Sequence, residues 1–333
     1  MSNIRDVSEL AGVSKATVSR VVNGKNQVKQ ETRDKVYAAM EQLGYRPNKL
    51  AQALAKSKTD SIGFVVSNYD GGYVGDMLKQ ASLSAAKANK SLIVTDSQSN
   101  PEQEYEAVLQ LEGRCDAIVL YSRTLCYDQI QKLYQHLSTP MVLMNLVIPE
   151  QLFHTVSFDQ EGAVETMMEH LIRCGHKNIA CITGKVDNPT GRARLAGYKN
   201  TLLKHGLVYS PDLVRQADYL IDGAYFSCRE MIEHSRPFTA VIAFNDYMAL
   251  GAMKALTEAG IQVPQQVSVA GIDNHLIATY TTPTLTTIEL PLKEMTDQAI
   301  DIAVQLSNEY IPPRAHRYTG KLVVRNSVAR VMT

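Results

Sequence analysis

From residue 61 onward, short apolar runs alternate with amphipathic stretches along the chain. The runs are nearly uninterrupted, which is typical of strands that are buried on both faces. The stretches between them, such as 73–90, 103–113 and 248–260, repeat their apolar residues at helical spacing. This alternation predicts an α/β body of doubly wound parallel sheets covered by helices. The apolar runs are 61–67, 91–97, 117–122, 141–146, 179–184, 240–245 and 267–273.

Polar side chains gather where these predicted strands end. Parallel sheets of this kind bind ligands beyond the carboxyl ends of their strands. Carboxylates and amides can bind adjacent hydroxyl groups, and a tyrosine ring can stack on the apolar face of a pyranose. The pattern therefore predicts a sugar-binding cavity. The polar residues at the strand ends are Asn68, Asp70, Tyr73, Tyr121, Ser122, Asn145, Asp159, Asn245, Asp246, Asp273 and Asn274.

The beginning of the chain follows a different pattern, with three short helical stripes. Gly12 ends the first stripe because glycine readily adopts the left-handed conformation after a helix. Ser14 is a favourable N-cap for the second helix, which ends at Asn23 and Gly24. Two short helices joined by such a turn form a helix-turn-helix, and a third helix can close the core. The apolar positions are Ile4, Val7, Leu10 and Ala11, then Val18, Val21 and Val22, and then Val36, Ala39, Met40 and Leu43.

Charge separates this head from the body. Residues 1–58 contain 11 lysines and arginines against 5 aspartates and glutamates, although the whole chain has a formal net charge of zero. A basic head on an acidic body indicates a polyanionic partner for the head. Lys or Arg side chains can donate to guanine in the major groove, a small apolar group can contact a thymine methyl, and hydroxyls can hold phosphates. The alternative is a small helical bundle with a solvated cationic face. The residues predicted to contact DNA here are Ser14, Lys15, Ala16, Thr17, Ser19, Arg20 and Asn23.

Residues 44–59 connect the two parts. Pro47 cannot continue the third helix, and Asn48 can cap a short helix over 50–55. This segment is too short to be a stable helix in water. Two interpretations are open: a plain linker, or a hinge that becomes helical on DNA and inserts Leu54 into the minor groove.

Other classes of protein fit the sequence less well. The five cysteines have neither zinc spacing nor a disulfide pattern, so we expect buried small hydrophobes and a reducing cytoplasm. The N-terminus lacks the apolar core of a signal peptide, and no apolar stretch is long enough to span a membrane. Phosphate-loop, HExxH and GxSxG motifs are absent, and the eight histidines are scattered. We therefore expect no enzyme activity, no metal and no cofactor. A transport receptor would share the body's architecture, but the basic head and the missing signal peptide argue against this class.

Several motifs resemble those of one family. The stretches IRDVSELAGVSKATVSRVVNG and YRPNKLAQALA, then RLAGYKNTL at 194–202 and NDYMALGAMKALTEAG at 245–260, resemble the LacI/GalR family of bacterial transcription regulators. The resemblance extends over essentially the whole chain, and regulators of β-glucoside or galactoside utilisation are the most similar subgroup. It implies two periplasmic-binding-protein-like subdomains that close on a small molecule, and a homodimer whose two heads read a near-palindromic operator. Because the chain ends without leucine heptads, a dimer rather than a tetramer is expected.

The resemblance also implies domain boundaries and cavity residues. The head would span 1–46, the hinge 47–60 and the body 61–333. The N-subdomain of the body would comprise about 61–158 and 290–318, and the C-subdomain about 159–289 and 319–333. The implied effector-binding residues are Tyr73, Asn188, Arg194, Asn245 and Asp273, with Asp159, Tyr219 and Asp246 as further candidates.

Several of these positions have open alternatives. Asn245 and Asp273 could simply cap helices, and Arg194 could form a surface ion pair. Tyr73 could merely sit at a turn after Gly71 and Gly72, and for Tyr219 a place outside the cavity is equally open. The family pattern near 159 is an Asp-Asn pair, but the sequence here is FDQEG, which puts the contact of Asp159 in doubt. Lys29 stands where the family has a capping serine, so we expect a frayed start of the third helix. The implied function is repression of sugar-utilisation genes, relieved by a sugar. The alternative effector is a purine or a partner protein.

Overall fold

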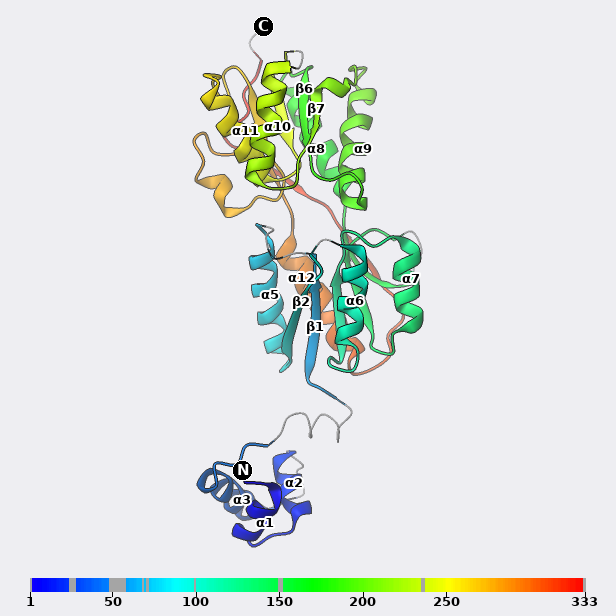
Figure 1. Ribbon diagram of the computed structural model, residues 1–333, viewed down its shortest axis with the longest axis vertical. Helices are drawn as coiled ribbons and strands as arrows, with labels where there is room; N and C mark the ends of the chain where they lie inside the picture. The colour runs from blue at the N-terminus through cyan, green and yellow to red at the C-terminus, as the bar shows by residue number, and fades with distance from the viewer. Residues whose placement is uncertain are drawn as a thin grey trace. The chain divides into compact units, whose positions relative to one another are not determined.

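The computed structural model describes residues 2–23, 28–47, 58–67, 69, 72–98, 100–148, 152–234 and 237–331. The chain divides into two compact units, Met1–Asp60 and Ser61–Thr333, which we call the head and the body (Figure 1).

The head consists of three short helices: α1 (Ile4–Leu10), α2 (Lys15–Val22) and α3 (Gln30–Gln42). Their apolar stripes meet in one small cluster, which confirms the predicted helix-turn-helix with a third helix. The buried members of that cluster are Val7, Val18, Val21, Val36 and Ala39.

Local signals set the helix ends in the head. Gly12 has a φ of +65°, so the chain turns there after α1, and the Ser14 hydroxyl accepts the Thr17 amide at the start of α2. Lys29 supplies no side-chain cap, yet α3 begins directly after it. Leu10 was expected in the core and is instead 45% exposed, because it lies on the flank of a helix only seven residues long.

The body contains two lobes. The N-lobe is built on a six-stranded parallel sheet in the order β11-β5-β4-β3-β1-β2. Side chains of β1 alternate between the two faces: Phe64 packs with Met77 in one cluster, and Val65 packs with Val108 in another. The strands are β1 (Ser61–Val66), β2 (Ser91–Asp96), β3 (Ala117–Tyr121), β4 (Met141–Asn145), β5 (His154–Phe158) and β11 (Ala315–Tyr318). The helices are α5 (Val74–Lys87), α6 (Pro101–Leu111), α7 (Tyr127–His136) and α12 (Leu292–Leu306).

The C-lobe is built on a four-stranded parallel sheet in the order β7-β6-β8-β9. These strands are β6 (Ile179–Thr183), β7 (Val214–Gln216), β8 (Ala240–Ala243) and β9 (Ser268–Ala270). The helices are α8 (Gln160–Arg173), α9 (Pro189–Lys204), α10 (Ile221–His234) and α11 (Asp246–Glu258). The doubly wound parallel sheets predicted from the sequence are therefore confirmed, although β5, β7 and β11 were not anticipated.

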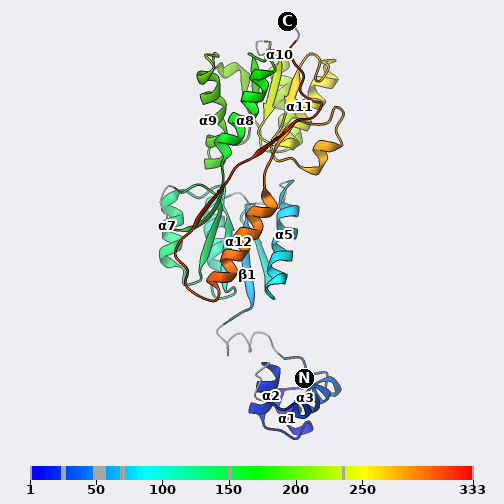
Figure 2. The ribbon, with the colours of Figure 1, turned by 180° about the vertical axis from the view of Figure 1, so that it is seen from behind.

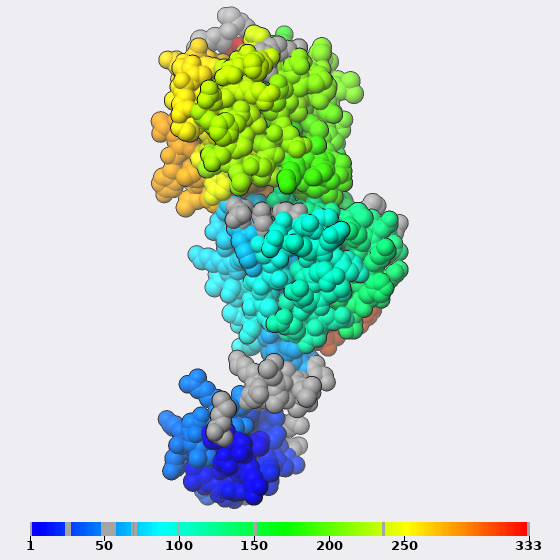
Figure 3. All heavy atoms as spheres, in the orientation of Figure 1, coloured from blue at the N-terminus to red at the C-terminus, as the bar shows by residue number. Residues whose placement is uncertain are grey.

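Three crossings of the chain join the lobes. One lies between β5 and α8, one between β10 (Thr287–Glu289) and α12, and one between β11 and β12 (Lys321–Val323). Strands β10 and β12 pair antiparallel with each other, so two of the crossings run side by side (Figure 2). The two lobes meet along one boundary in Figure 3.

The lobes also touch at a glycine. A Cβ atom at Gly72, just before α5, would lie 2.6 Å from Cε2 of Tyr247 in α11. A residue with a side chain there would require the Tyr247 ring to move.

Within the described ranges, the structure has no helix that is both long and apolar enough to cross a membrane.

Candidate functional site

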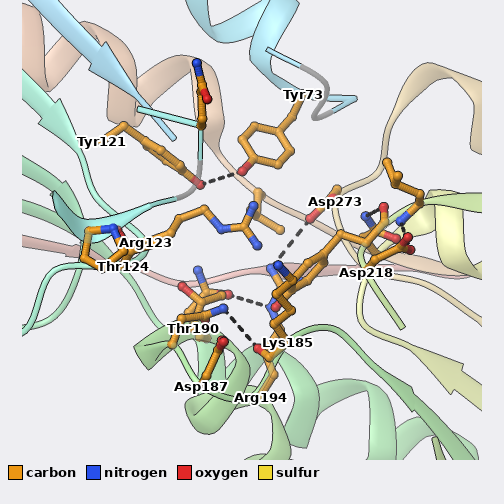
Figure 4. Close-up of a pocket in the computed structure, with 18 of the residues that line it drawn as sticks. Tyr73, Tyr121, Arg123, Thr124, Lys185, Asp187, Thr190, Arg194, Asp218 and Asp273 are labelled. Atoms are coloured by element: carbon orange, nitrogen blue, oxygen red, sulfur yellow. Dashed lines mark hydrogen bonds and ion pairs between the residues drawn. The ribbon is translucent and has the colours of Figure 1, made fainter. Parts of the chain in front are cut away.

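A cavity of about 520 Å³ lies where the carboxyl ends of strands from both lobes meet (Figure 4). This volume is in the range typical of small-molecule sites. The residues that line it are Tyr73, Asp96, Gln98, Pro101, Tyr121, Arg123, Thr124, Gln160, Lys185, Asp187, Asn188, Thr190, Arg194, Asp218, Tyr219, Leu220, Asn245, Asp273 and Leu290.

Tyrosines and an arginine form the N-lobe wall. Tyr73 precedes α5 and Tyr121 ends β3, and the Tyr121 hydroxyl donates to the Tyr73 hydroxyl at 3.2 Å. Their rings are tilted by 51°, with centroids 5.9 Å apart. The guanidinium of Arg123 lies 4.4 Å from the ring centroid of Tyr219, which comes from the C-lobe.

Arg194 is the centre of the C-lobe wall. It is 4% exposed, and its Nε donates to the Gln160 side-chain oxygen at 2.7 Å. It also donates to the Phe244 carbonyl and forms an ion pair with Asp273 at 3.6 Å. The alternative of a surface ion pair for Arg194 is therefore wrong, because the side chain is buried in the cavity wall.

Asn188 and Asn245 line the cavity and also cap helices. The Asn188 side-chain oxygen accepts the Gly191 amide at 2.8 Å, at the start of α9. The Asn245 oxygen accepts the Met248 amide at 2.7 Å, at the start of α11, and its amide group donates to the Tyr219 carbonyl. Each side chain keeps some unused hydrogen-bonding capacity for a ligand.

Asp273 caps no helix and faces Arg194. Burial raises the pKa of Asp273 to about 6, although the charges of Arg194 and Arg123 oppose that rise. Its φ of +118° is unusual for a residue with a side chain, and strain of this kind persists only where the surroundings impose it.

Asp246 and Asp159 do not line the cavity. Burial and the neighbouring charge of Asp273 raise the pKa of Asp246 to about 8. Its carboxyl group accepts the Thr287 hydroxyl at 2.5 Å and the His275 amide at 2.7 Å. Asp159 caps α8 through the Gly162 amide and pairs with Arg317 at 2.9 Å, so the next residue, Gln160, reaches the cavity instead.

A polar chain joins the lobes beside the cavity. The Asn145 amide donates to the Thr190 hydroxyl at 3.2 Å, and its oxygen accepts the Gln160 amide at 2.9 Å. Because Gln160 also bonds to Arg194, the cavity wall is directly connected to the contact between the lobes.

The sequence pattern missed part of the wall. Arg123 and Lys185 lie two residues beyond the ends of β3 and β6, and Gln160 lies two residues beyond β5. Extending the carboxyl-end rule by two residues would have found all three. Of the other strand-end residues, Asn68 and Asp70 lie outside the described residues.

The head presents its candidate residues on the surface of α2. Lys15, Ala16 and Arg20 are exposed, whereas Thr17 and Ser19 are half-buried. The Ser14 hydroxyl lies 2.9 Å from the Thr17 hydroxyl, and Asn23 donates to Ser19. Asn48 and Leu54 lie outside the described residues.

The part of the chain that the structure describes contains no group of three or more His, Cys, Asp or Glu side chains arranged to hold a metal ion.

Comparison with known proteins matches the two units of the chain separately. Residues 3–48 match the profile of bacterial regulatory proteins of the lacI family, and residues 168–328 match that of the periplasmic binding protein-like domain.

Whole-chain relatives agree with these matches. The HTH-type transcriptional regulator AscG of Escherichia coli K12 is 38% identical over 98% of both chains. The solved lac repressor dimer bound to operator and the anti-inducer ONPF superimposes with a TM-score of 0.90 at 29% identity, over 98% of this chain and 99% of that one. A solved E. coli LacI-family regulator described as sugar-binding, in complex with phosphate, is 34% identical with a TM-score of 0.72, over 82% of this chain and 100% of that one. The chain therefore belongs to the LacI family of bacterial regulatory proteins and is a DNA-binding transcriptional regulator.

Proposed function

We propose that this regulator is a homodimeric repressor of sugar-utilisation genes, whose operator affinity falls when a sugar binds between the lobes. The observation that carries the proposal is the composition of the cavity wall. Arg194, Asp273 and two capping asparagines present fixed donors and acceptors, and Tyr73 and Tyr121 add aromatic surface. Sugars, with many hydroxyls on a ring that has apolar faces, match such a wall.

The tyrosine geometry favours a sugar over a purine. A purine would be held best between parallel rings, but the Tyr73 and Tyr121 rings contact each other at 51°. The third tyrosine, Tyr219, is covered by Arg123. The effector-binding residues in this proposal are Tyr73, Asn188, Arg194, Tyr219, Asn245 and Asp273.

The DNA-binding part of the proposal rests on the exposed face of α2. Lys15, Ala16 and Arg20 would contact bases in the major groove of an operator half-site. The Ser14 hydroxyl and the amides at the start of α2 would hold a phosphate. The hinge, with Asn48 as cap and Leu54 as minor-groove wedge, remains part of the proposal. Such a protein works in the cytoplasm, where the operator is, and acts by binding rather than catalysis.

Selection of binding sites from random duplex DNA at fixed salt tests the operator claim first. A near-palindromic site is expected, because two heads of a dimer bind two half-sites. The selected duplex then serves as the probe in a titration with a panel of sugars. Release of the protein from DNA by one of them supports the proposal.

One substitution links the cavity to that response. Asp273→Asn should abolish release by sugar and leave operator affinity in the absence of sugar unchanged, because the cavity is part of the body. Asp128→Asn, which removes an exposed carboxylate outside the cavity, is the matched control. A normal sugar response of the Asp273→Asn protein would exclude the cavity as the effector site.

A further inference from the structure

The two arginines of the cavity differ in how their charges are satisfied. Arg194 is paired with Asp273 and hydrogen-bonded to Gln160 and Phe244. Arg123 is half-buried in the opposite wall, and no described carboxylate lies within ion-pair distance of its guanidinium. We propose that Arg123 binds the phosphate group of a phosphorylated sugar. This inference rests on the proposed sugar-binding function and specifies the chemical class of the effector.

The position of Arg123 is built into the fold. The buried carboxyl of Glu104 in α6 accepts the Thr124 hydroxyl at 2.6 Å, and the Arg123 backbone amide also hydrogen-bonds to it. The loop that follows β3 is thus hydrogen-bonded to α6. From this base the Arg123 side chain extends into the cavity, beneath the hydrogen bond between Tyr73 and Tyr121 (Figure 4).

The carboxylates of the cavity do not neutralise Arg123. The charge of Arg123 lowers the pKa of Asp273, but the ion pair of Asp273 is with Arg194. That charge also lowers the pKa of Glu104, whose buried carboxyl hydrogen-bonds to Thr124 and does not line the cavity. Asp96 accepts the Gln98 amide, and Asp187 and Asp218 are exposed, where water and salt screen their charge. The inner wall therefore keeps one positive charge that contacts the Tyr219 side chain but that no described carboxylate neutralises by an ion pair.

A second cation faces the same space from the other lobe. Lys185 follows β6, is exposed, and forms no ion pair with any described residue. A phosphate monoester carries close to two negative charges at neutral pH. Bound between Arg123 and Lys185, it would neutralise one cation from each lobe and hold the lobes together.

A neutral sugar would satisfy the wall less well. Hydroxyl groups can accept from a guanidinium, but a ligand without charge would exclude water from Arg123 and leave its charge uncompensated. The planar fork of an arginine matches phosphate oxygens in a bidentate geometry that a neutral acceptor does not reproduce. A carboxylate of a uronic acid supplies only one negative charge.

Calorimetry on the full-length protein tests the proposal with matched ligands. The ligand pairs are glucose and glucose 6-phosphate, and a β-glucoside and its 6-phosphate, with glucuronate and inorganic phosphate as further probes. The wild-type protein should bind the phosphorylated member of a pair at least tenfold more tightly. Arg123→Gln should weaken binding of the phosphorylated sugar by about 10- to 100-fold, as expected for a lost charge-assisted contact, and should not weaken binding of the neutral sugar.

Two further variants make the result specific. Arg173→Gln removes an exposed arginine of α8 outside the cavity and should change neither affinity. Lys185→Gln should weaken binding of the phosphorylated sugar by less than Arg123→Gln does, because Lys185 is exposed. Circular dichroism spectra of the variants establish that they are folded.

The outcomes separate the phosphate inference from the proposed function. Three results would each overturn the inference and leave a sugar regulator. The wild-type protein could bind the neutral sugar more tightly than its phosphorylated form, or prefer glucuronate to glucose 6-phosphate. Alternatively, Arg123→Gln could weaken the binding of both members of a pair equally. If neither the sugars nor phosphate bind the wild-type protein or release the operator, the inference and the sugar-binding proposal both fail.

Discussion

In the head, the residues proposed to meet DNA lie on the outside of α2, whereas in the body the residues proposed to meet the effector lie inside a cavity and bind one another. Lys15 and Arg20 are exposed and form no ion pair with a described residue. Arg194 is 4% exposed and is bonded to Gln160 and Asp273. On α2, exposed side chains would exchange solvent for DNA. In the cavity wall, hydrogen bonds and an ion pair among the residues themselves hold the side chains in place.

This difference predicts different consequences of mutation. Removing a side chain from the surface of α2 should change binding and leave folding intact. Removing one from the cavity wall should change folding as well, because a buried partner is left behind. Four experiments test how far that distinction holds.

The largest effect is expected for Arg194→Ala. The substitution leaves the buried Asp273 carboxylate without its ion-pair partner, which typically costs about 3–5 kcal/mol. Urea unfolding of the full-length protein, followed by circular dichroism, should show that the body of the variant unfolds at a much lower urea concentration than that of the wild-type protein. Arg192→Ala, which removes an exposed arginine two positions away, should change the free energy of unfolding by less than about 0.5 kcal/mol. Equal midpoints for the two variants would contradict the view that the cavity wall is a bonded unit.

Arg20→Ala should act in the opposite way. A good base contact in the major groove is worth about 1–3 kcal/mol, so operator affinity should fall by that amount while urea unfolding stays unchanged. Lys35→Ala, in α3, removes a charge from the same head and serves as the control. Fluorescence anisotropy with the selected operator measures both. If the two variants lose the same affinity, Arg20 contributes only general charge.

The pH dependence of stability probes Asp246. Its carboxyl keeps its proton up to about pH 8 in the folded body, whereas in the unfolded chain it loses it near 3.8. The folded state binds more protons in that window, so stability should fall as pH rises, by at most about 1.4 kcal/mol per pH unit. Asp273 contributes in the same direction only up to about pH 6.

The measurement is therefore made between pH 6.5 and 8, where, of these two carboxyl groups, only Asp246 contributes to the pH dependence. Asp246→Asn should flatten the dependence, because an amide resembles the protonated carboxyl and does not titrate. A slope unchanged by the substitution would show that Asp246 is already ionised in this window.

The smallest effect is expected at the N-cap of α2. Ser14→Ala should lower the stability of the head by about 1 kcal/mol, since the Thr17 amide loses its acceptor. Ser14→Asp should keep the cap and the stability but weaken DNA binding, because it places a negative charge beside the phosphates. Hydrogen exchange of the α2 amides and an operator titration separate the two effects. A normal operator affinity for Ser14→Asp would remove Ser14 from the DNA interface.

The exposed site was the easier of the two to predict from the sequence. Helical periodicity assigns Lys15, Ala16 and Arg20 to the face opposite Val18 and Val21, and the structure places them there. Leu10 escaped this rule because a helix of seven residues has a poorly defined edge.

The cavity was predicted only in part, because it depends on contacts between distant segments. The carboxyl-end rule and the family resemblance located Tyr73, Arg194 and Asp273. They did not show that the Asp159 carboxylate caps α8 and pairs with Arg317. Nor did they show that the Asp246 carboxyl accepts hydrogen bonds from Thr287 and His275. These outcomes depend on which neighbours the topology provides, and periodicity carries no such information.

Gly72 has a consequence for how such a regulator could be adjusted. A Cβ atom there would lie 2.6 Å from Cε2 of Tyr247 in the opposite lobe, so even one methyl group would require the Tyr247 ring to turn or the lobes to move apart on that side. In the proposed function, in which a ligand binds between the lobes, the size of this one side chain would bias how closely the lobes approach, although it contacts neither the effector nor DNA. Residues at position 72 of increasing volume would make a graded series of proteins that bind the same ligand through the same wall and respond at different concentrations of it.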